Sequence, residues 1–453
     1  MAVTSAQATI AARMERVPLF SLHRKLVFVL GVGTFFDLFD IALGGLLAAI
    51  LANIYHLNAF QTAAIIASGF FGMFVGAAVL SVVSDYFGRR TMFLIDLLIY
   101  SLFSLAVAFS PNVIWVIIFR FFAGIGLGAT PPLTDVYLSE MLPSKVRGKY
   151  TAWAYTFGLL AVPVAGLLSK SLVSVTFLMA GWRWLLIVGA LGALVVWFLR
   201  RGLPESPRWF ESRKKTAEAS AATSAIEHAA TRELHLAELP PPTLADVEPP
   251  KRTTLAESFR GIYARRTTML LIFQFFQAVG FYGFGSLAPL ILVAKGFSVV
   301  NTLAFTAPIA LGYPLGSLLS VPIVERLERK WLIVGTALLM ALFGLVFGFA
   351  TSVPIIIASG FLLTVTSQVF SNSYHIYQAE IFPTRMRGTA VGVAYSLSRL
   401  SSAILPFVAL SLLQASGPVA VFTAAAIIMG IVSLDVGLLG PRTTGQSLEE
   451  VAH

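Results

Sequence analysis

Long apolar stretches recur along the whole chain, and they constrain its fold more than any motif. About 20 consecutive apolar residues cross a bilayer as a helix. The composition fits a membrane location, since 57% of the 453 residues are hydrophobic, 12% are charged and the mean hydropathy is +0.83. Soluble domains carry about 25% charged residues, so a soluble fold is excluded. We expect an all-α membrane protein with twelve transmembrane helices at 26–51, 62–83, 91–110, 112–138, 150–171, 182–200, 267–294, 301–324, 331–351, 353–378, 388–412 and 418–440.

The positions of the 32 Lys and Arg residues predict which side of the membrane each loop faces. With the N-terminus in the cytoplasm, the outer loops hold only Lys170, Arg183 and Lys295, and Arg120 and Arg399 fall within helices. Short cytoplasmic loops are enriched in Lys and Arg, so both termini are predicted to be cytoplasmic in the plasma membrane. The net charge of +10 then reflects topology and lipid headgroups, and a nucleic-acid partner is not expected.

The predicted helices divide into two sets of six. We expect a cytoplasmic tail (1–25), an N-terminal six-helix bundle (26–200), a cytoplasmic linker (201–266), a C-terminal six-helix bundle (267–440) and a second cytoplasmic tail (441–453). Within the linker, residues 211–239 are rich in Ala, Glu, Lys and Arg, which predicts a surface helix. Prolines at 240–242 and 249–250 end it.

Several kinds of chemistry are excluded by the residues present. The chain has no cysteine, so it forms neither disulfides nor thiolate metal sites. No two of its six histidines are three or four residues apart, and it has no phosphate-binding loop of the Walker type. We therefore expect no metal, no cofactor and no ATP-driven step. No pairing of a nucleophile with a base suggests an enzyme.

An internal repeat relates the two sets of helices. The segment from Tyr137 to Gly148 has the pattern Tyr-x-x-Glu-x-x-Pro-x-x-x-Arg-Gly, and the segment from Tyr377 to Gly388, 240 residues later, has the same pattern. A second pair of segments, 85–90 and 325–330, stands in the same register. Two motifs in one register indicate duplicated halves. Transporters built from such repeats bind substrate between the halves and rock one half against the other.

These motifs resemble those of the major facilitator superfamily over nearly the whole chain. The loop Ser-Asp-Tyr-Phe-Gly-Arg-Arg (84–90) is similar to the superfamily's motif between helices two and three. The segments 137–148 and 204–210 are similar to sugar-porter signatures. Phe36–Asp40, Arg120–Gly128, Tyr282–Pro289 and Arg385–Gly388 resemble the branch of niacin, metabolite–proton and organic-ion transporters. Bacterial niacin transporters of this branch tend to have an acid where this chain has Thr130-Pro131-Pro132, which argues against niacin itself.

Charged residues within the predicted spans are the first candidates for a functional site, because a charge at membrane depth is costly. Asp37 and Asp40 lie three residues apart on one face of the first helix, and Arg120 lies at an overlapping depth of the fourth. We expect these three residues to couple transport to protons, with Asp37 favoured as the proton carrier because its depth overlaps with that of Arg120. The alternative is an ion pair that only fixes helix packing.

Arg399 lies midway along the helix predicted at 388–412, and no acid lies at similar depth in its own half. Because arginine keeps its charge, a cavity-facing Arg399 is best explained by an anionic substrate. The resemblance supports this, since organic-anion transporters of the branch carry Arg at a similar place. The alternative is pairing across the halves with Asp37 or Asp40. Three further acids are expected to cap helix ends locally or to join the cytoplasmic charges: Asp96, Asp135 and Asp435.

Aromatic and amide side chains complete the predicted substrate site. Buried hydroxyls and amides need hydrogen-bond partners, and aromatic walls suit a small, flat ligand. For any single aromatic residue, packing is the simpler explanation. The substrate-site candidates beside Arg399 are Tyr282, Tyr374, Gln274, Gln277 and Phe281.

Acidic and basic residues also recur at corresponding helix ends on the predicted cytoplasmic side. Acids contribute little to topology, so their presence suggests ion pairs. The resemblance implies that such pairs close the inner face and break during the transport cycle. This predicted gate comprises Asp85, Arg89, Arg90, Glu140 and Arg147, with Glu325, Arg329, Glu380 and Arg387 in the second half.

The sequence thus predicts a secondary active transporter that works by alternating access. Its favoured activity is proton-coupled symport of a small organic anion, aromatic or another monocarboxylate such as a nicotinate-like acid. Two alternatives remain: proton symport of a neutral sugar or polyol, and a non-transporting membrane sensor on the same fold. The expected partners are a small-molecule substrate, protons and the lipid bilayer, and the protein is expected to be a monomer.

Overall fold

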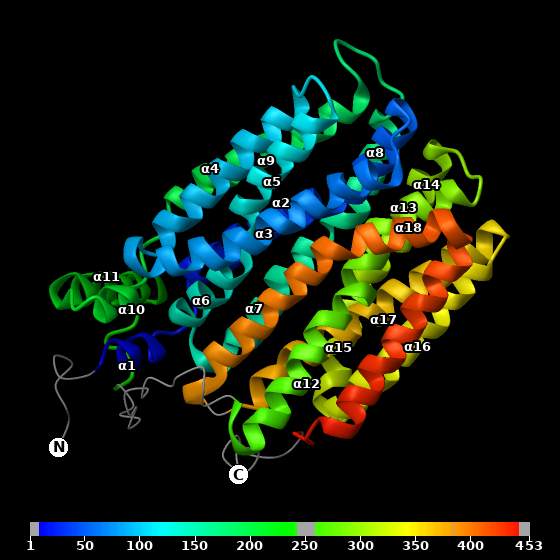
Figure 1. The fold of residues 1–453 in the computed structure, drawn as a ribbon. Coiled ribbons are helices and arrows are strands. Elements are labelled where there is room, and N and C mark those ends of the chain that lie inside the picture. Colours follow the sequence, from blue (N-terminus) through cyan, green and yellow to red (C-terminus); the bar gives the residue numbers. More distant parts are fainter. Residues whose placement is uncertain (1–8, 242–258, 383, 444–453) are drawn as a thin grey trace.

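The computed structural model describes residues 9–241, 259–382 and 384–443, which form long helices joined by short turns (Figure 1). The N-terminal half contains α2 (Ser21–Tyr55), α3 (Ala59–Phe87), α4 (Arg89–Ala108), α5 (Val113–Gly128), α6 (Thr130–Met141), α7 (Ser144–Leu159), α8 (Ala161–Leu172) and α9 (Gly181–Arg201). The C-terminal half contains α12 (Gly261–Ala278), the π-helix η2 (Val279–Gly283), α13 (Phe284–Ala294), α14 (Val299–Ala310), α15 (Gly312–Arg326), α16 (Arg329–Phe349), α17 (Val353–Glu380) and α18 (Thr384–Leu439).

Twelve membrane crossings arise from these helices. Eleven segments of the described chain are long and apolar enough to span a bilayer. The last of them lies in α18, which is broken at Gly417 by non-helical backbone angles (φ 78°, ψ −178°). The left-handed φ favours glycine, and Pro418 follows it. The break divides α18 into two crossings, so the prediction of twelve transmembrane helices in two six-helix halves is confirmed.

Equivalent helices of the two halves follow the 240-residue repeat. α4 begins at Arg89 and α16 at Arg329, and α5 begins at Val113 and α17 at Val353. The halves meet through symmetric contacts, because α3 packs on α18 and α8 packs on α14. The internal repeat seen in the sequence is therefore a repeat of structure.

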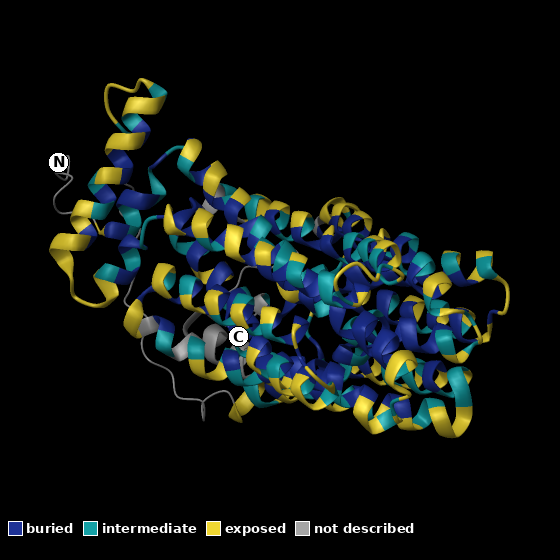
Figure 2. Ribbon diagram, turned by 90° about the horizontal axis from the view of Figure 1, so that it is seen from above, coloured by how far each residue is buried: buried dark blue, intermediate teal, exposed yellow. Residues whose placement is uncertain are grey.

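Burial follows the pattern of a membrane bundle (Figure 2). Large apolar side chains cover the outside of the helices, for example Phe28, Leu102, Phe198, Leu319 and Leu338, each more than half exposed. A soluble monomer rarely exposes so much apolar surface. Lipid chains would cover it, which fits the multi-pass assignment.

Three short helices lie beyond one end of the bundle, which we call the inner end: α1 (Ile10–Glu15), α10 (Pro207–Ser212) and α11 (Thr216–Leu234) (Figure 1). α11 lies within the surface helix predicted for the linker. Arg13 and Arg16 of α1 form ion pairs with Glu227 of α11 at 2.6 and 2.8 Å. Burial alone would raise the pKa of Glu227, but the hydrogen bonds from both guanidinium groups outweigh it and lower the pKa below its ordinary value.

Candidate functional site

A buried ion pair lies in the middle of the N-terminal half. Arg120 Nη2 of α5 lies 3.7 Å from Asp40 Oδ2 of α2, and their side chains are 4% and 6% exposed. Arg120 Nε also donates to the Ile65 carbonyl at 3.2 Å. The guanidinium fits because glycine stands beside it: a Cβ added at Gly44 or Gly69 would lie 3.0 or 3.2 Å from Arg120 Nη2. The helices thus leave a slot for this side chain.

Asp40, rather than Asp37, forms the ion pair with Arg120. Asp37 lies almost one turn closer to the inner end, and its strongest electrostatic interaction is with Arg200 of α9. Arg200 Nη2 lies against α2, where a Cβ at Gly33 would be only 1.9 Å from it. Both side chains are buried. The two predicted acids therefore face different arginines.

Two residues that lie near Asp37 and Asp40 in the structure, Arg200 and Asp96, were not selected from the sequence. Arg200 is the penultimate residue of α9, and it was counted among the cytoplasmic charges. Asp96 was expected to cap the end of its helix, but it is completely buried and interacts electrostatically with Arg200 and Asp37. A signal existed: Asp96, Tyr100 and Ser104 recur every four residues, which places them on one face of α4.

Arg399 of α18 forms the predicted cationic centre of the C-terminal half. It is 4% exposed, and its Cζ lies 4.9 Å from the ring centre of Tyr282 and 5.0 Å from that of Tyr395. Nη2 donates to the Tyr395 hydroxyl. Among the described residues, no carboxylate lies within 4 Å of Arg399, and its Nη1 has no hydrogen-bond partner. The alternative pairing with Asp37 or Asp40 is therefore not formed.

Tyr282 reaches Arg399 from the short π-helix η2. This helix interrupts the seventh crossing over Val279–Gly283, and π-turns inside α-helices are frequent at functional sites. Tyr282 also packs edge-on against Phe70 of α3, with ring centres 5.4 Å apart. The predicted neighbour Phe281 contacts Tyr282 and Tyr313. Arg399 and its aromatic partners thus lie where the two halves meet.

The other predicted substrate residues lie on α12 and α17 of the C-terminal half. Gln274 donates to Gln378 at 2.8 Å, and Gln277 donates to Gln274 at 3.0 Å. Tyr374 is buried in an apolar cluster with Phe273 and Phe370. Both glutamines are fully buried, so this network fixes α12 against α17.

The sequence predicted that Asp135 joins the charges at the inner end or caps a helix end, and the structure places it elsewhere. It is exposed, and its Oδ1 accepts a hydrogen bond of 2.9 Å from the Tyr155 hydroxyl of α7. The next residue, Thr156, bonds to Ser317 of α15 at 2.9 Å. Asp135 therefore lies beside the contact between the two halves. Tyr155 also interacts electrostatically with Tyr395, which is the hydroxyl partner of Arg399.

The predicted gate forms the same ion pair in each half. Arg89 Nη2 lies 3.3 Å from Glu140, and Arg329 Nη2 lies 3.4 Å from Glu380. Each pair joins two helices of one half, α4 to α6 and α16 to α17. Asp435, near the end of α18, is buried. The structure describes the backbone but not the side chains of four predicted gate residues: Asp85, Arg147, Glu325 and Arg387.

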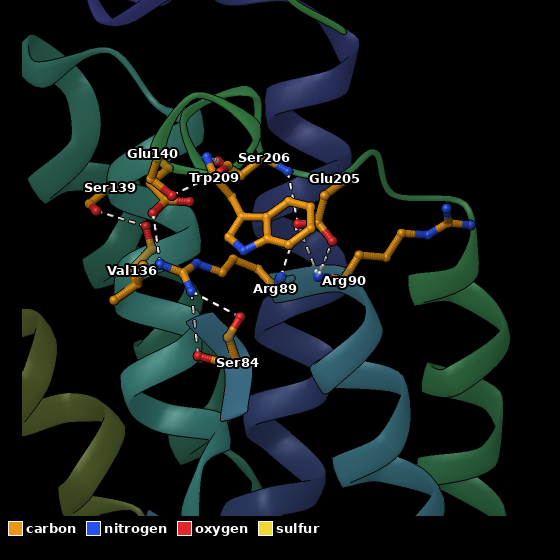
Figure 3. Close-up of polar contacts among 10 residues, drawn as sticks. Ser84, Arg89, Arg90, Val136, Ser139, Glu140, Glu205, Ser206 and Trp209 are labelled. Atoms are coloured by element: carbon orange, nitrogen blue, oxygen red, sulfur yellow. Dashed lines mark hydrogen bonds and ion pairs between the residues drawn. The ribbon is translucent and has the colours of Figure 1, made fainter. Parts of the chain in front are cut away.

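Glu205 of the linker extends this gate in the N-terminal half (Figure 3). Its carboxylate accepts hydrogen bonds from the backbone N–H groups of Arg89 and Arg90 at 2.9 and 3.1 Å. These are the first N–H groups of α4, which favour an acid. Burial raises the pKa of Glu205, against the lowering effect of these N–H groups. Arg90 Nη2 donates to the Arg201 carbonyl at 2.6 Å.

Comparison with known proteins agrees with this architecture. The family described as sugar (and other) transporter matches residues 26–453. YyaJ of Bacillus subtilis, named as a metabolite transport protein, is 33% identical over 413 residues, which cover 89% of each chain. The niacin transporter NiaP of Acinetobacter baylyi is 29% identical over 98% of this chain and 99% of its own.

The fold has a close counterpart among solved structures. The crystal structure of a D-xylose–proton symporter aligns with a TM-score of 0.74 at 20% identity, over 94% of this chain and 100% of the other. The family and these relatives are transporters rather than enzymes. The chain therefore belongs to the sugar (and other) transporter family, within the major facilitator superfamily.

Proposed function

We propose that the protein is a proton-coupled symporter of a small organic anion, with its inner end facing the cytoplasm. Substrate binds at Arg399, between the halves, and the halves rock around it. The Asp40–Arg120 pair and the neighbouring Asp37 bind and release the coupling proton. In this arrangement the C-terminal half binds the anion and the N-terminal half binds the proton.

The environment of Arg399 is the observation that supports this proposal. A permanently charged guanidinium is buried beside aromatic rings, and no acid among the described residues balances its charge within 4 Å. A buried charge without a counter-ion is costly. A substrate carboxylate would provide that counter-ion, and the Tyr282 and Tyr395 rings would pack against a flat substrate.

The relatives support the same class of substrate at a coarse level. A niacin transporter is a relative over nearly the whole chain, and niacin is an aromatic carboxylic acid. The Thr130-Pro131-Pro132 segment still argues against niacin itself. We therefore propose the broader class of aromatic and other monocarboxylates.

Uptake of radiolabelled nicotinate, benzoate and D-xylose into proteoliposomes with an imposed pH gradient tests the proposal. We expect wild type to accumulate at least one of the two carboxylates. Arg399→Ala should abolish this uptake, and Arg399→Lys should restore only part, because lysine lacks the planar fork that matches a carboxylate. Arg232→Ala, on the exposed face of α11, is the matched control. Full uptake by folded Arg399→Ala would refute the anion site.

The second candidate is proton symport of a neutral sugar or polyol. The family description includes sugars, and the amides of Gln274, Gln277 and Gln378 are suited to hydroxyl groups. Accumulation of D-xylose, without carboxylate uptake and with Arg399→Ala still active, would favour this candidate.

A further inference from the structure

The N-terminal half contains more buried charge than the Asp40–Arg120 pair requires. Asp37, Asp96 and Arg200 are at most 5% exposed, and none of them belongs to that pair. The inference below rests on the proposed proton coupling, and it concerns the path that the proton takes.

Two helix faces oppose each other along this cluster. Asp96, Tyr100 and Ser104 lie on one face of α4, and Asp37 and Asp40 lie on α2. Ser104 Oγ donates to Asp40 Oδ1 at 3.5 Å. One turn closer to the inner end, the Tyr100 hydroxyl donates to the backbone carbonyl of Phe36, the residue before Asp37, at 3.5 Å. Polar groups therefore succeed one another between these helices at each turn.

Arg200 closes this row at the inner end. Its guanidinium lies 4.4 Å from the ring centre of Phe93, one turn before Asp96 on α4. On the other side it lies against Gly33, one turn before Asp37 on α2. Arg200 thus lies between the two helices and interacts with both Asp37 and Asp96.

The polar atoms of this row are poorly satisfied. Within the described part of the chain, both carboxylate oxygens of Asp96, Oδ1 of Asp37 and all three side-chain nitrogens of Arg200 lack a hydrogen-bond partner. Leaving a buried polar group unsatisfied costs about 1–3 kcal/mol. Such groups call for an explanation in a native structure, and a function in proton transfer provides one.

The charges of the cluster also do not balance without a proton. Three carboxyl groups (Asp37, Asp40 and Asp96) face two guanidinium groups (Arg120 and Arg200), which are always charged. With all acids ionised the cluster has a charge of minus one, and with one acid protonated it is neutral. Burial disfavours net charge, so the neutral cluster holds one proton.

We propose that Asp40, Asp37 and Asp96 form a proton relay inside the N-terminal half, with Asp96 as the acceptor nearest the inner end. A proton leaves a carboxyl oxygen of Asp40 or Asp37, binds a carboxylate oxygen of Asp96, and then passes to water at the inner end. The cluster's charge is unchanged until that release. At about 1.5 Å per residue, the row from Ser104 to Asp96 covers about 12 Å, and Asp96 lies about 10 Å from the start of α4.

The relay ends at the gate. Tyr137 interacts with Arg200 on one side and with Arg90, Glu140 and Glu205 on the other. Arg90, Glu140 and Glu205 belong to the charged groups at the inner end of the N-terminal half. The proton's exit thus lies beside the gate residues.

The test uses ligand-free protein in liposomes, so it does not depend on knowing the substrate. Infrared difference spectroscopy follows the C=O band of protonated carboxyl groups after a pH jump. We expect one N-terminal-half carboxyl to titrate. Tyr100→Phe removes the hydroxyl of the same row and leaves the three acids and two guanidinium groups in place, so it should slow this deprotonation about 100-fold, as expected when a positioned proton-transfer group is removed. Asp96→Asn should remove the band, because two carboxylates and two guanidinium groups balance without a proton, and Asp96→Glu should keep it. Asp435→Asn, a buried acid of the other half, should remove only its own band and leave the rate unchanged.

The outcomes separate the two proposals. If the titrating band persists in both Asp37→Asn and Asp40→Asn, the proposed coupling site fails. If these variants remove the band but Asp96→Asn keeps it with the wild-type deprotonation rate, the coupling site stands and the relay is refuted. The relay also requires slower deprotonation in Tyr100→Phe, and a wild-type rate in that variant refutes it.

Discussion

Removing the Asp40 carboxylate gives the sharpest test of the buried ion pair. At the 3.7 Å separation of Arg120 and Asp40, two unit charges attract each other by about 4.5 kcal/mol at an effective dielectric constant of about 20. Asp40→Asn should lose this attraction and leave Arg120 buried without its partner, which costs about 3–5 kcal/mol when a buried pair is broken. Arg120→Met should cost a similar amount.

The double variant Asp40→Asn/Arg120→Met separates pair formation from general disruption. We expect it to be more stable than either single variant, because it leaves no unpaired charge. Unfolding by denaturant at alkaline pH, where Asp40 is ionised, gives the coupling energy from the four proteins. A coupling energy within about 0.5 kcal/mol of zero would mean that the two sites are independent. The ion pair would then not contribute to stability.

The same variant distinguishes coupling from packing. If Asp40 carries the proton, Asp40→Asn should lose uphill, pH-driven uptake in liposomes and keep some substrate counterflow, because exchange requires no net proton movement. Asp37→Asn should be milder if Asp37 only relays the proton. Uphill uptake that persists in both single variants and in their double variant would rule out these acids as the coupling site.

Two further predictions concern packing and pH. Gly72→Ala should destabilise the protein by about 1–3 kcal/mol in thermal melts, because the added Cβ would lie 2.0 Å from the Phe121 carbonyl oxygen. Gly335→Ala is the control and should be neutral, because its Cβ would meet no atom within 4 Å. The pKa of Glu227 in the folded protein is lowered. Its ion pairs with α1 are therefore fully formed above its unfolded pKa of about 4.3 and are lost as the pH falls through the lower folded value. Spin labels on α1 and α11 should move apart only in that acidic range, and labels that stay together there in the wild type would contradict the prediction.

The sequence predicts the fold more fully than the site. Hydropathy and the 240-residue repeat gave the number of crossings and the correspondence of the two halves. Depth along a helix gave the level of Asp37, Asp40 and Arg120. Depth did not show in which direction around the helix axis each side chain points. The side chains of residues i and i+3 point about 60° apart. That difference places Asp40 at Arg120 and turns Asp37 toward Arg200.

Long side chains near helix ends were the second source of error. Arg200 is one residue from the end of α9, where an arginine usually extends toward water. In the structure its guanidinium instead extends between α2 and α4. Only tertiary packing decides between these directions. In contrast, Arg399 and Tyr282 were both selected from their types and depth, and the structure brings them into contact.

The π-helix η2 makes the seventh crossing unusually sensitive to chain length. In a regular α-helix each residue turns the chain by about 100° and advances it by about 1.5 Å, whereas a π-turn accommodates a wider loop of backbone. Losing one residue between Val279 and Gly283 would allow a continuous α-helix and would change the direction in which the side chains of this segment point. Tyr282 would then no longer face Arg399. Insertions and deletions in this short segment should therefore be far less acceptable, among functional descendants of this protein, than substitutions that preserve its length.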